Sequence, residues 1–143
     1  MCENRPIIVE QNFDVPISIV WDAISQVDQM KQWFFENIES FKPEVGFETQ
    51  FNVQAESRDF MHIWKIIEVV QSKKIVYEWK YENIPGEANV IFELFVQGQE
   101  TMLRLTNFGL ESFPQDIPEF SRESGVNGWK YFIQDRLKEF LNS

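Results

Sequence analysis

The sequence contains few of the residues that most often carry reaction chemistry. Among its 143 residues there is one cysteine, Cys2, and one histidine, His62. A single cysteine excludes an internal disulfide and any metal site built from several cysteines. A zinc site would need Asp or Glu for most of its ligands, and none occur at a recognisable spacing. We therefore expect neither a metal nor a cofactor.

Two further absences argue against common classes of enzyme. No Gly-x-Ser-x-Gly motif, which presents the nucleophile of many serine hydrolases, occurs in the chain. No glycine-rich phosphate loop follows a predicted strand, which argues against nucleotide-dependent catalysis. The sequence therefore names no catalytic residue, and the balance favours a protein without enzymatic activity.

Basic residues and long apolar runs are also scarce. The 13 Lys and Arg are outnumbered by 23 Asp and Glu, which gives a formal net charge of −10. Such a charge repels phosphate backbones, so a nucleic-acid partner is not expected. No stretch approaches the roughly 20 apolar residues of a membrane span, and residues 1–9 lack the pattern of a secretion signal. We expect a cytoplasmic protein.

Aromatic residues, in contrast, are abundant. The chain has 14 Phe, 5 Trp and 3 Tyr, which is 15% of all residues. A chain of this length buries roughly two-thirds of its unfolded surface and is typical of one domain. No repeat or linker divides it, so residues 1–143 are predicted to form a single domain with an aromatic core.

The first third of the chain predicts one strand and two short helices. Residues 7–13 are rich in β-branched side chains and favour a strand. Pro16 suits the start of a helix, which is predicted over residues 16–25. Asp28 is a candidate N-cap for a second helix, whose apolar side would hold Met30, Trp33 and Phe34.

The middle of the chain predicts five consecutive strands. Apolar and polar residues alternate from residue 44 to 53, and further apolar runs separated by short polar turns cover residues 60–70, 73–81, 89–96 and 101–108. Pro85 and Gly86 are expected to precede the fourth of these strands. Short connections favour antiparallel neighbours, so the five strands should form a meander.

The last helix is predicted to start between residues 119 and 125 and to end near residue 141. Its apolar residues recur at spacings of three and four and form one broad stripe: Trp129, Phe132, Ile133, Leu137, Phe140 and Leu141. Only the sheet is large enough to cover this stripe. The predicted fold is therefore α+β, β-α-α-β5-α, with a curved antiparallel sheet wrapped around a long C-terminal helix.

Several segments resemble a known superfamily. Phe13-Asp14-Val15-Pro16 with Val20-Trp21, then Trp33-Phe34, and finally Gly128-Trp129 with Arg136-Leu137, occur in its order and spacing. The chain is similar to the START-like superfamily, also called SRPBCC or polyketide cyclase, and most of all to its heat-shock-protein ATPase activator-like family. The resemblance implies a helix-grip fold with a cavity that often holds an apolar or aromatic molecule. Family members often carry a histidine where this chain has Asn107, so a catalytic histidine is excluded there.

The candidate binding site is a group of aromatic residues expected to converge between sheet and helix. Its members are Trp33, Phe34, Phe51, His62, Trp64, Trp79, Phe92, Trp129 and Phe132. Aromatic walls suit flat ligands because each ring offers a large contact area and few rotatable bonds. The alternative is that the same rings form a solid core, since a cavity costs packing energy.

Three polar residues have both a functional and a structural interpretation. His62 and Trp64 are two residues apart in a predicted strand, so their side chains should lie on the same face of the sheet. His62 then faces inward if Trp64 does, unless a bulge near Ile67 exchanges the faces. There it can bond a ligand oxygen or act as an acid or base, or it can be purely structural. Arg104 can hold a ligand carboxylate or pair with Glu93 on the adjacent strand, and Arg136 can reach the rim of the cavity or remain solvated.

Three functions are compatible with these features. The leading hypothesis is a protein that binds a small hydrophobic molecule in the cavity. The second is an interaction protein that regulates a chaperone ATPase, which only the family resemblance suggests. The third is an enzyme of the polyketide cyclase or aromatase type, with His62 or Arg104 assisting.

Overall fold

The computed structural model describes residues 6–55, 58–114, 117 and 120–142. Its elements follow the predicted order of a strand, two short helices, five strands and a final helix. The strands are β1 (Ile7–Phe13), β2 (Glu48–Ala55), β3 (Arg58–Val70), β4 (Lys74–Tyr81), β5 (Ile84–Gln97) and β6 (Glu100–Phe108). The helices are α1 (Ile17–Ser25), α2 (Val27–Trp33), η1 (Leu110–Ser112), α3 (Arg122–Lys130), η3 (Tyr131–Leu137) and α4 (Lys138–Asn142).

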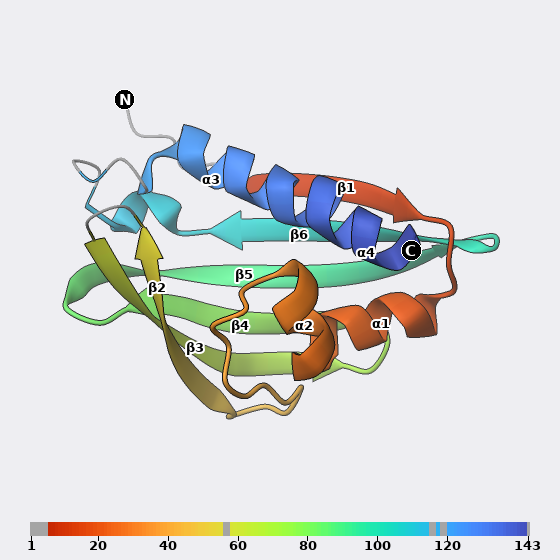
Figure 1. Ribbon diagram of the computed structural model, residues 1–143, viewed down its shortest axis with the longest axis horizontal. Helices are drawn as coiled ribbons and strands as arrows, with labels where there is room; N and C mark the ends of the chain where they lie inside the picture. Colours follow the sequence, from red (N-terminus) through yellow and green to blue (C-terminus); the bar gives the residue numbers. More distant parts are fainter. Residues whose placement is uncertain (1–5, 56–57, 115–116, 118–119, 143) are drawn as a thin grey trace.

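Within this described part, the strands form a six-stranded sheet in the order β1-β6-β5-β4-β3-β2. Every neighbouring pair is antiparallel. Strands β2 to β6 thus form the predicted meander. The last of these strands, β6, pairs on its other edge with β1, the first strand of the chain. Figure 1 shows α3, η3 and α4 as one continuous helix beside β1 and β6.

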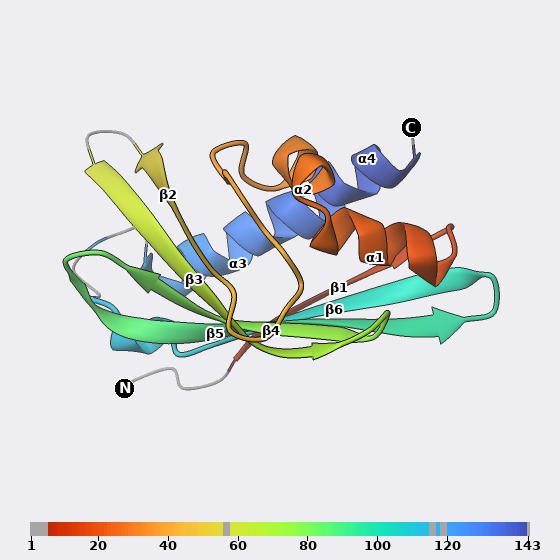
Figure 2. The ribbon, with the colours of Figure 1, turned by 90° about the horizontal axis from the view of Figure 1, so that it is seen from below.

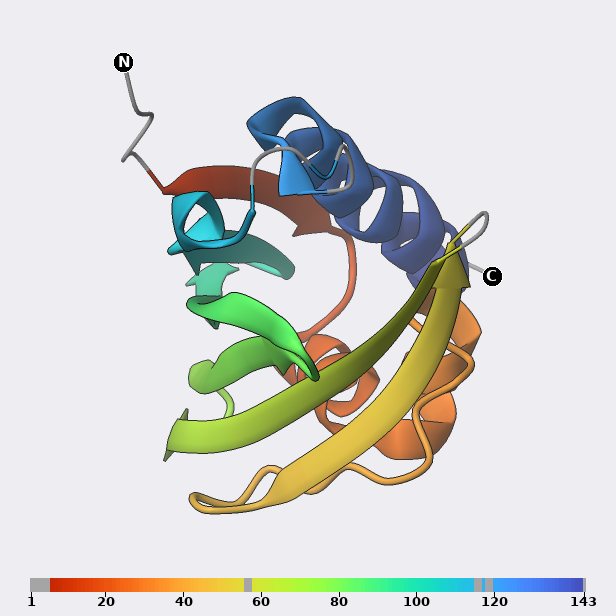
Figure 3. The same cartoon turned by 90° about the vertical axis from the view of Figure 1, so that its left-hand side faces the viewer.

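The sheet is strongly curved, and all the long helices lie on its concave side. Figure 2 shows α1, α2 and the C-terminal helix above the sheet, while β2 and β3 curl up toward them. In the end view of Figure 3 the strands wrap around the C-terminal helix from β1 to β2. The predicted helix-grip architecture is confirmed.

Side chains alternate between the two faces as the sequence predicts. On β6, Leu103 and Leu105 are fully buried, whereas Arg104 between them is partly exposed. On β3, His62 and Trp64 both point inward, and the register shifts between Ile66 and Glu68. The bulge therefore lies where it was anticipated, but beyond His62, so the histidine keeps its inward orientation.

Three predicted boundaries are wrong. Strand β2 begins at Glu48 rather than at residue 44. Strand β5 begins at Ile84, ahead of Pro85, because the β4–β5 register shifts next to this segment and Gly86 takes a φ of +110°. That left-handed φ suits glycine and permits a bulge that continues the strand.

The third wrong boundary is the start of α2. Its N-cap is Gln26, not Asp28, and no side chain caps it. Gln26 has extended backbone angles and also ends α1, so the two helices follow each other directly. Asp28 instead lies in the first turn, where its negative charge favours the positive end of the helix dipole.

Candidate functional site

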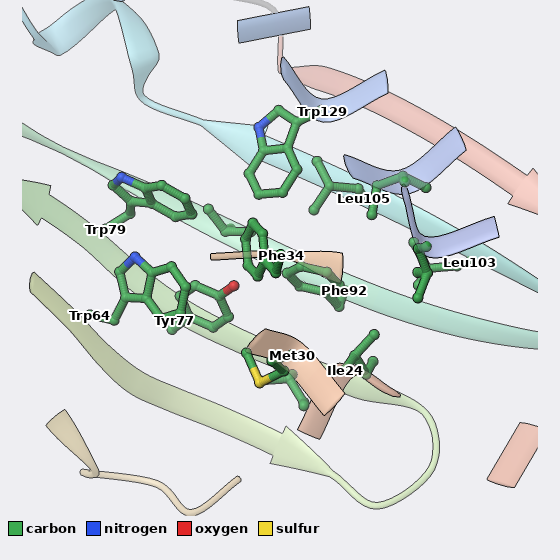
Figure 4. Packing of buried hydrophobic residues seen from close by; sticks show 14 of the residues in the cluster. Ile24, Met30, Phe34, Trp64, Tyr77, Trp79, Phe92, Leu103, Leu105 and Trp129 are labelled. Carbon is green, nitrogen blue, oxygen red and sulfur yellow. The ribbon is translucent and has the colours of Figure 1, made fainter. Parts of the chain in front are cut away.

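One end of the interior is a closely packed aromatic cluster centred on Phe34. Its ring stacks on Trp33 at 4.8 Å between centroids and lies 5.5 Å from Trp64 and 6.3 Å from Phe92. Figure 4 shows Phe34 surrounded by rings from several strands. Phe34 follows α2 directly, so this helix delivers it to the sheet. We call Trp33, Phe34, Trp64, Tyr77 and Phe92 the packed end.

The other end contains a pocket of about 250 Å³. It lies between the concave face of β2 to β6, the segment after β6 and the start of the C-terminal helix. Its walls are formed by Phe35, Val53, Phe60, His62, Trp79, Tyr81, Ala88, Asn107, Leu110, Phe113, Phe120, Gly125, Gly128, Trp129 and Phe132. We call this region the pocket end.

The structure divides the nine predicted site residues between the two ends. Those that line the pocket are His62, Trp79, Trp129 and Phe132. Those that are buried without lining it are Trp33, Phe34, Phe51, Trp64 and Phe92. Some of them lie directly behind the walls, since the Phe34 ring is 4.9 Å from that of Phe132 between centroids. The tightly packed rings fit the solid-core alternative, and the binding hypothesis remains a prediction that rests on the pocket.

Several wall residues were missed by the sequence reasoning. Tyr81 could have been found, because it shares strand parity with Trp79 and pairs directly with His62 across the β3–β4 ladder. Phe113 and Phe120 lie in the segment between β6 and α3, which has no periodic pattern. Their rings nevertheless meet each other and Tyr81 at 5.0–5.2 Å between centroids.

Two glycines on α3 shape the pocket. A methyl group on Gly125 would lie 2.9 Å from Leu110 Cδ2 and 3.0 Å from Ile7 Cδ1, so glycine allows the helix to approach its neighbours closely. A methyl group on Gly128 would meet nothing within 4 Å. Gly128 also lines the pocket, so the missing side chain leaves open space there.

His62 is buried and neutral. Its Nδ1 lies 3.0 Å from the carbonyl oxygen of Phe60, and because a carbonyl only accepts, Nδ1 carries the proton. Burial lowers the pKa of His62 to about 4, although the bond to Phe60 acts in the opposite direction. The Nε2 atom therefore keeps a lone pair, and it has no hydrogen-bond partner among the described residues.

The two tryptophans of the pocket are anchored through their ring nitrogens. Trp79 Nε1 donates to the Tyr81 hydroxyl at 2.7 Å, and Trp129 Nε1 donates to Asn107 Oδ1 at 3.1 Å. Burial raises the pKa of Tyr81, so this side chain stays protonated. Asn107 thus serves to orient Trp129.

The two candidate arginines lie outside the pocket walls. Arg104 is on the outer face, where it lies opposite Glu93 in register but forms its ion pair with Glu10 at 2.6 Å. The expected pairing with Glu93 is therefore corrected to Glu10. Arg136 donates to the Gln32 carbonyl at 2.6 Å and links the C-terminal helix to α2.

Two negative findings apply to the described part of the chain only. No group of three or more His, Cys, Asp or Glu side chains there is arranged to hold a metal ion. None of the helices in that part has the length and apolar character needed to cross a membrane.

Solved structures share this architecture. Protein CV1439 from Chromobacterium violaceum matches with a TM-score of 0.82 and 16% identity over 99% of both chains. Protein MLL2253 from Mesorhizobium loti has a TM-score of 0.74 and 26% identity, over 96% of this chain and 97% of that one. DynU16, a protein in the dynemicin biosynthetic locus, has a TM-score of 0.77 and 18% identity, and the match covers 99% of this chain but 48% of DynU16.

The family of the chain is established by its sequence. No protein with a curated description matches it. The family model described as Activator of Hsp90 ATPase homolog 1-like protein matches residues 14–142, nearly the whole chain. The chain therefore belongs to this family, as the resemblance in its sequence predicted.

Proposed function

We propose that this protein binds a small, flat, apolar molecule in the pocket between the sheet and the C-terminal helix. The observation that carries the proposal is the pocket itself, about 250 Å³ with mostly aromatic and aliphatic walls. An apolar cavity of roughly 150 Å³ is enough to hold benzene. The present pocket has room for a molecule of about two fused rings.

The cost of the pocket supports a functional role. Protein interiors are normally packed without voids, and unfilled volume is destabilising. Here larger side chains at Gly128 or Ala88 would fill space, yet both positions hold small residues. The flat rings of Trp79 and Trp129 are fixed by hydrogen bonds. Binding a ligand would therefore cost little side-chain conformational entropy at these two residues.

A second candidate is regulation of a chaperone ATPase. Its support is the description of the family to which the chain belongs, which names activators of the Hsp90 ATPase. Such a role needs a protein partner rather than a pocket. A pull-down from cell extract that returns a stoichiometric chaperone would favour it, and the absence of any stoichiometric partner would count against it.

Native mass spectrometry of freshly purified protein tests the ligand proposal first. A retained apolar compound, identified after denaturation, would support binding and give the class of ligand. If the protein is empty, titration with a neutral environment-sensitive dye such as N-phenyl-1-naphthylamine and with naphthalene would follow. Failure of both naphthalene and the dye to bind would contradict the proposal.

Filling the pocket from the helix gives a sharper test. In Gly128→Leu the new side chain would enter the open space beside the pocket, and binding of naphthalene should fall at least tenfold. Stability should be retained, because leucine favours a helix by almost 1 kcal/mol over glycine. Asn127→Leu, at the adjacent exposed position, is the control that should leave binding unchanged. Equal binding by both variants would place the ligand elsewhere.

A further inference from the structure

The pocket contains two polar atoms that nothing in the described chain satisfies. One is the Nε2 lone pair of His62, and the other is the hydroxyl proton of Tyr81. The two residues are direct partners across the β3–β4 ladder, and their ring centroids lie 4.7 Å apart. The side chains that carry the free acceptor and the free donor are therefore neighbours in the pocket wall.

The remaining polar groups of the wall are already used. The Tyr81 oxygen accepts from Trp79 Nε1, which leaves its proton free to be donated. Asn107 accepts from Trp129 and donates its amide to the carbonyls of Asn89 and Phe108, both at 3.3 Å. In the part of the chain that the structure describes, a ligand thus meets only the acceptor of His62 and the donor of Tyr81.

Charged ligands do not suit these walls. The lining contains no Lys, Arg, Asp or Glu among the described residues. His62 cannot supply a positive charge near neutral pH, because burial lowers its pKa to about 4. A carboxylate or an ammonium group would therefore be buried without a counter-charge, at high cost. The complementary ligand is neutral.

We propose that His62 and Tyr81 form a subsite for the hydroxyl group of a flat aromatic ligand, a phenol or an aryl alcohol. The ligand hydroxyl donates to His62 Nε2 and accepts from the Tyr81 hydroxyl, while the aromatic walls cover the ring. A hydroxyl matches this pair because it is a donor and an acceptor at one atom. The inference rests on the proposed function and defines the ligand it takes.

Three probes of almost the same shape separate the two hydrogen bonds. Naphthalene offers only a ring, 2-methoxynaphthalene adds an acceptor, and 2-naphthol adds both an acceptor and a donor. Each neutral hydrogen bond should improve affinity about fivefold. Calorimetric or fluorescence titration of the wild-type protein is expected to rank 2-naphthol tightest, about fivefold ahead of 2-methoxynaphthalene, with naphthalene weakest.

Tyr81→Phe removes the donor while keeping the ring. It should abolish the advantage of 2-methoxynaphthalene over naphthalene and leave naphthalene bound. Tyr131→Phe removes an exposed tyrosine hydroxyl from the C-terminal helix and is the matched control, with the wild-type ranking expected.

The wild-type protein supplies a second measurement that does not depend on a variant folding. Its single histidine gives one pair of ring ¹⁵N signals. The Nε2 signal should move toward the hydrogen-bonded range with 2-naphthol and not with 2-methoxynaphthalene. Binding of naphthalene without any preference for 2-naphthol, or an unmoved Nε2 signal, would overturn the subsite alone. Failure of all three probes to bind would overturn the proposed function as well.

Discussion

The packed end and the pocket end lie under the same sheet, but different elements cover them. The packed end is covered by α1 and α2, which contribute large buried side chains such as Ile24, Met30 and Trp33. The pocket end is covered by the segment after β6, which contributes Phe113 and Phe120, and by α3, of whose nine residues Trp129 alone is buried. The sheet supplies aromatic rings to both ends. Whether the space is filled therefore depends on the covering helices.

The two ends also treat buried polar atoms differently. At the packed end, Trp64 Nε1 and the Tyr77 hydroxyl are buried without a hydrogen-bond partner in the described chain. At the pocket end, Trp79 and Trp129 both have acceptors for their ring nitrogens. The unpaired polar atoms of the packed end are thus enclosed by rings, whereas those of the pocket end, His62 Nε2 and the Tyr81 hydroxyl proton, belong to residues that line the pocket.

The largest expected effect is the loss of a central ring. Phe34→Ala should lower the free energy of unfolding by about 4 kcal/mol, because its cavity would be surrounded by rings that cannot collapse. Phe132→Ala, in the pocket wall, should cost only about 2 kcal/mol because this ring is half-buried. Urea unfolding followed by tryptophan fluorescence measures both values.

Binding should respond in the opposite order. Phe132→Ala removes part of the pocket wall and should weaken naphthalene binding several-fold. Phe34→Ala, if it is still folded at low temperature, removes a ring that lies behind the wall, 4.9 Å from Phe132 between centroids, and should weaken binding less. Equal losses of stability in the two variants would remove the distinction between the packed end and the pocket end.

The pH dependence of stability is the next effect in size. The pKa of His62 is about 4 in the folded protein, against 6.5 in an unfolded chain. Between these values the unfolded chain binds a proton that the folded protein does not, so stability falls as the pH falls from 6.5 toward 4. The total loss amounts to about 3 kcal/mol.

Comparison with His62→Gln isolates this contribution. Glutamine does not titrate, while the carboxylates contribute equally to both proteins. The difference between the two unfolding free energies should therefore shrink as the pH is lowered from 6.5 to 5. A difference that stays constant over this range would show that His62 is accessible to protons in the folded state.

The fold was predictable from periodicity, whereas the site was predictable only in part. Alternation in the strands and the apolar stripe of the last helix depend on neighbouring residues, so they are visible in the sequence. Strand parity also placed His62 inside correctly. The extended conformation of Gln26 and the bulge at Gly86 were missed because each depends on local backbone angles that several residue types allow.

Which aromatic residues line the pocket depends on contacts between distant segments. Trp64 and Trp79 face the same side of the sheet, yet only Trp79 reaches the pocket, because α2 carries Phe34 over Trp64. Phe113 and Phe120 come from a segment with no periodic signal. Neighbouring residues in the sequence carry no information about either arrangement, so the sequence indicated Trp79 and Trp129 but could not separate Trp79 from Trp64.

The smallest predicted effect tests the contrast in polar atoms through two tyrosines. Tyr77→Phe removes a buried hydroxyl that has no partner and should raise the free energy of unfolding by about 1 kcal/mol. Tyr81→Phe removes the acceptor of Trp79 Nε1 and should lower it by about the same amount. The two substitutions are chemically identical, so their difference measures only the surroundings of each hydroxyl. Chemical denaturation of both variants beside the wild type gives the signs, and a loss of stability in Tyr77→Phe would show that its hydroxyl is satisfied in solution, which would contradict the contrast drawn between the two ends.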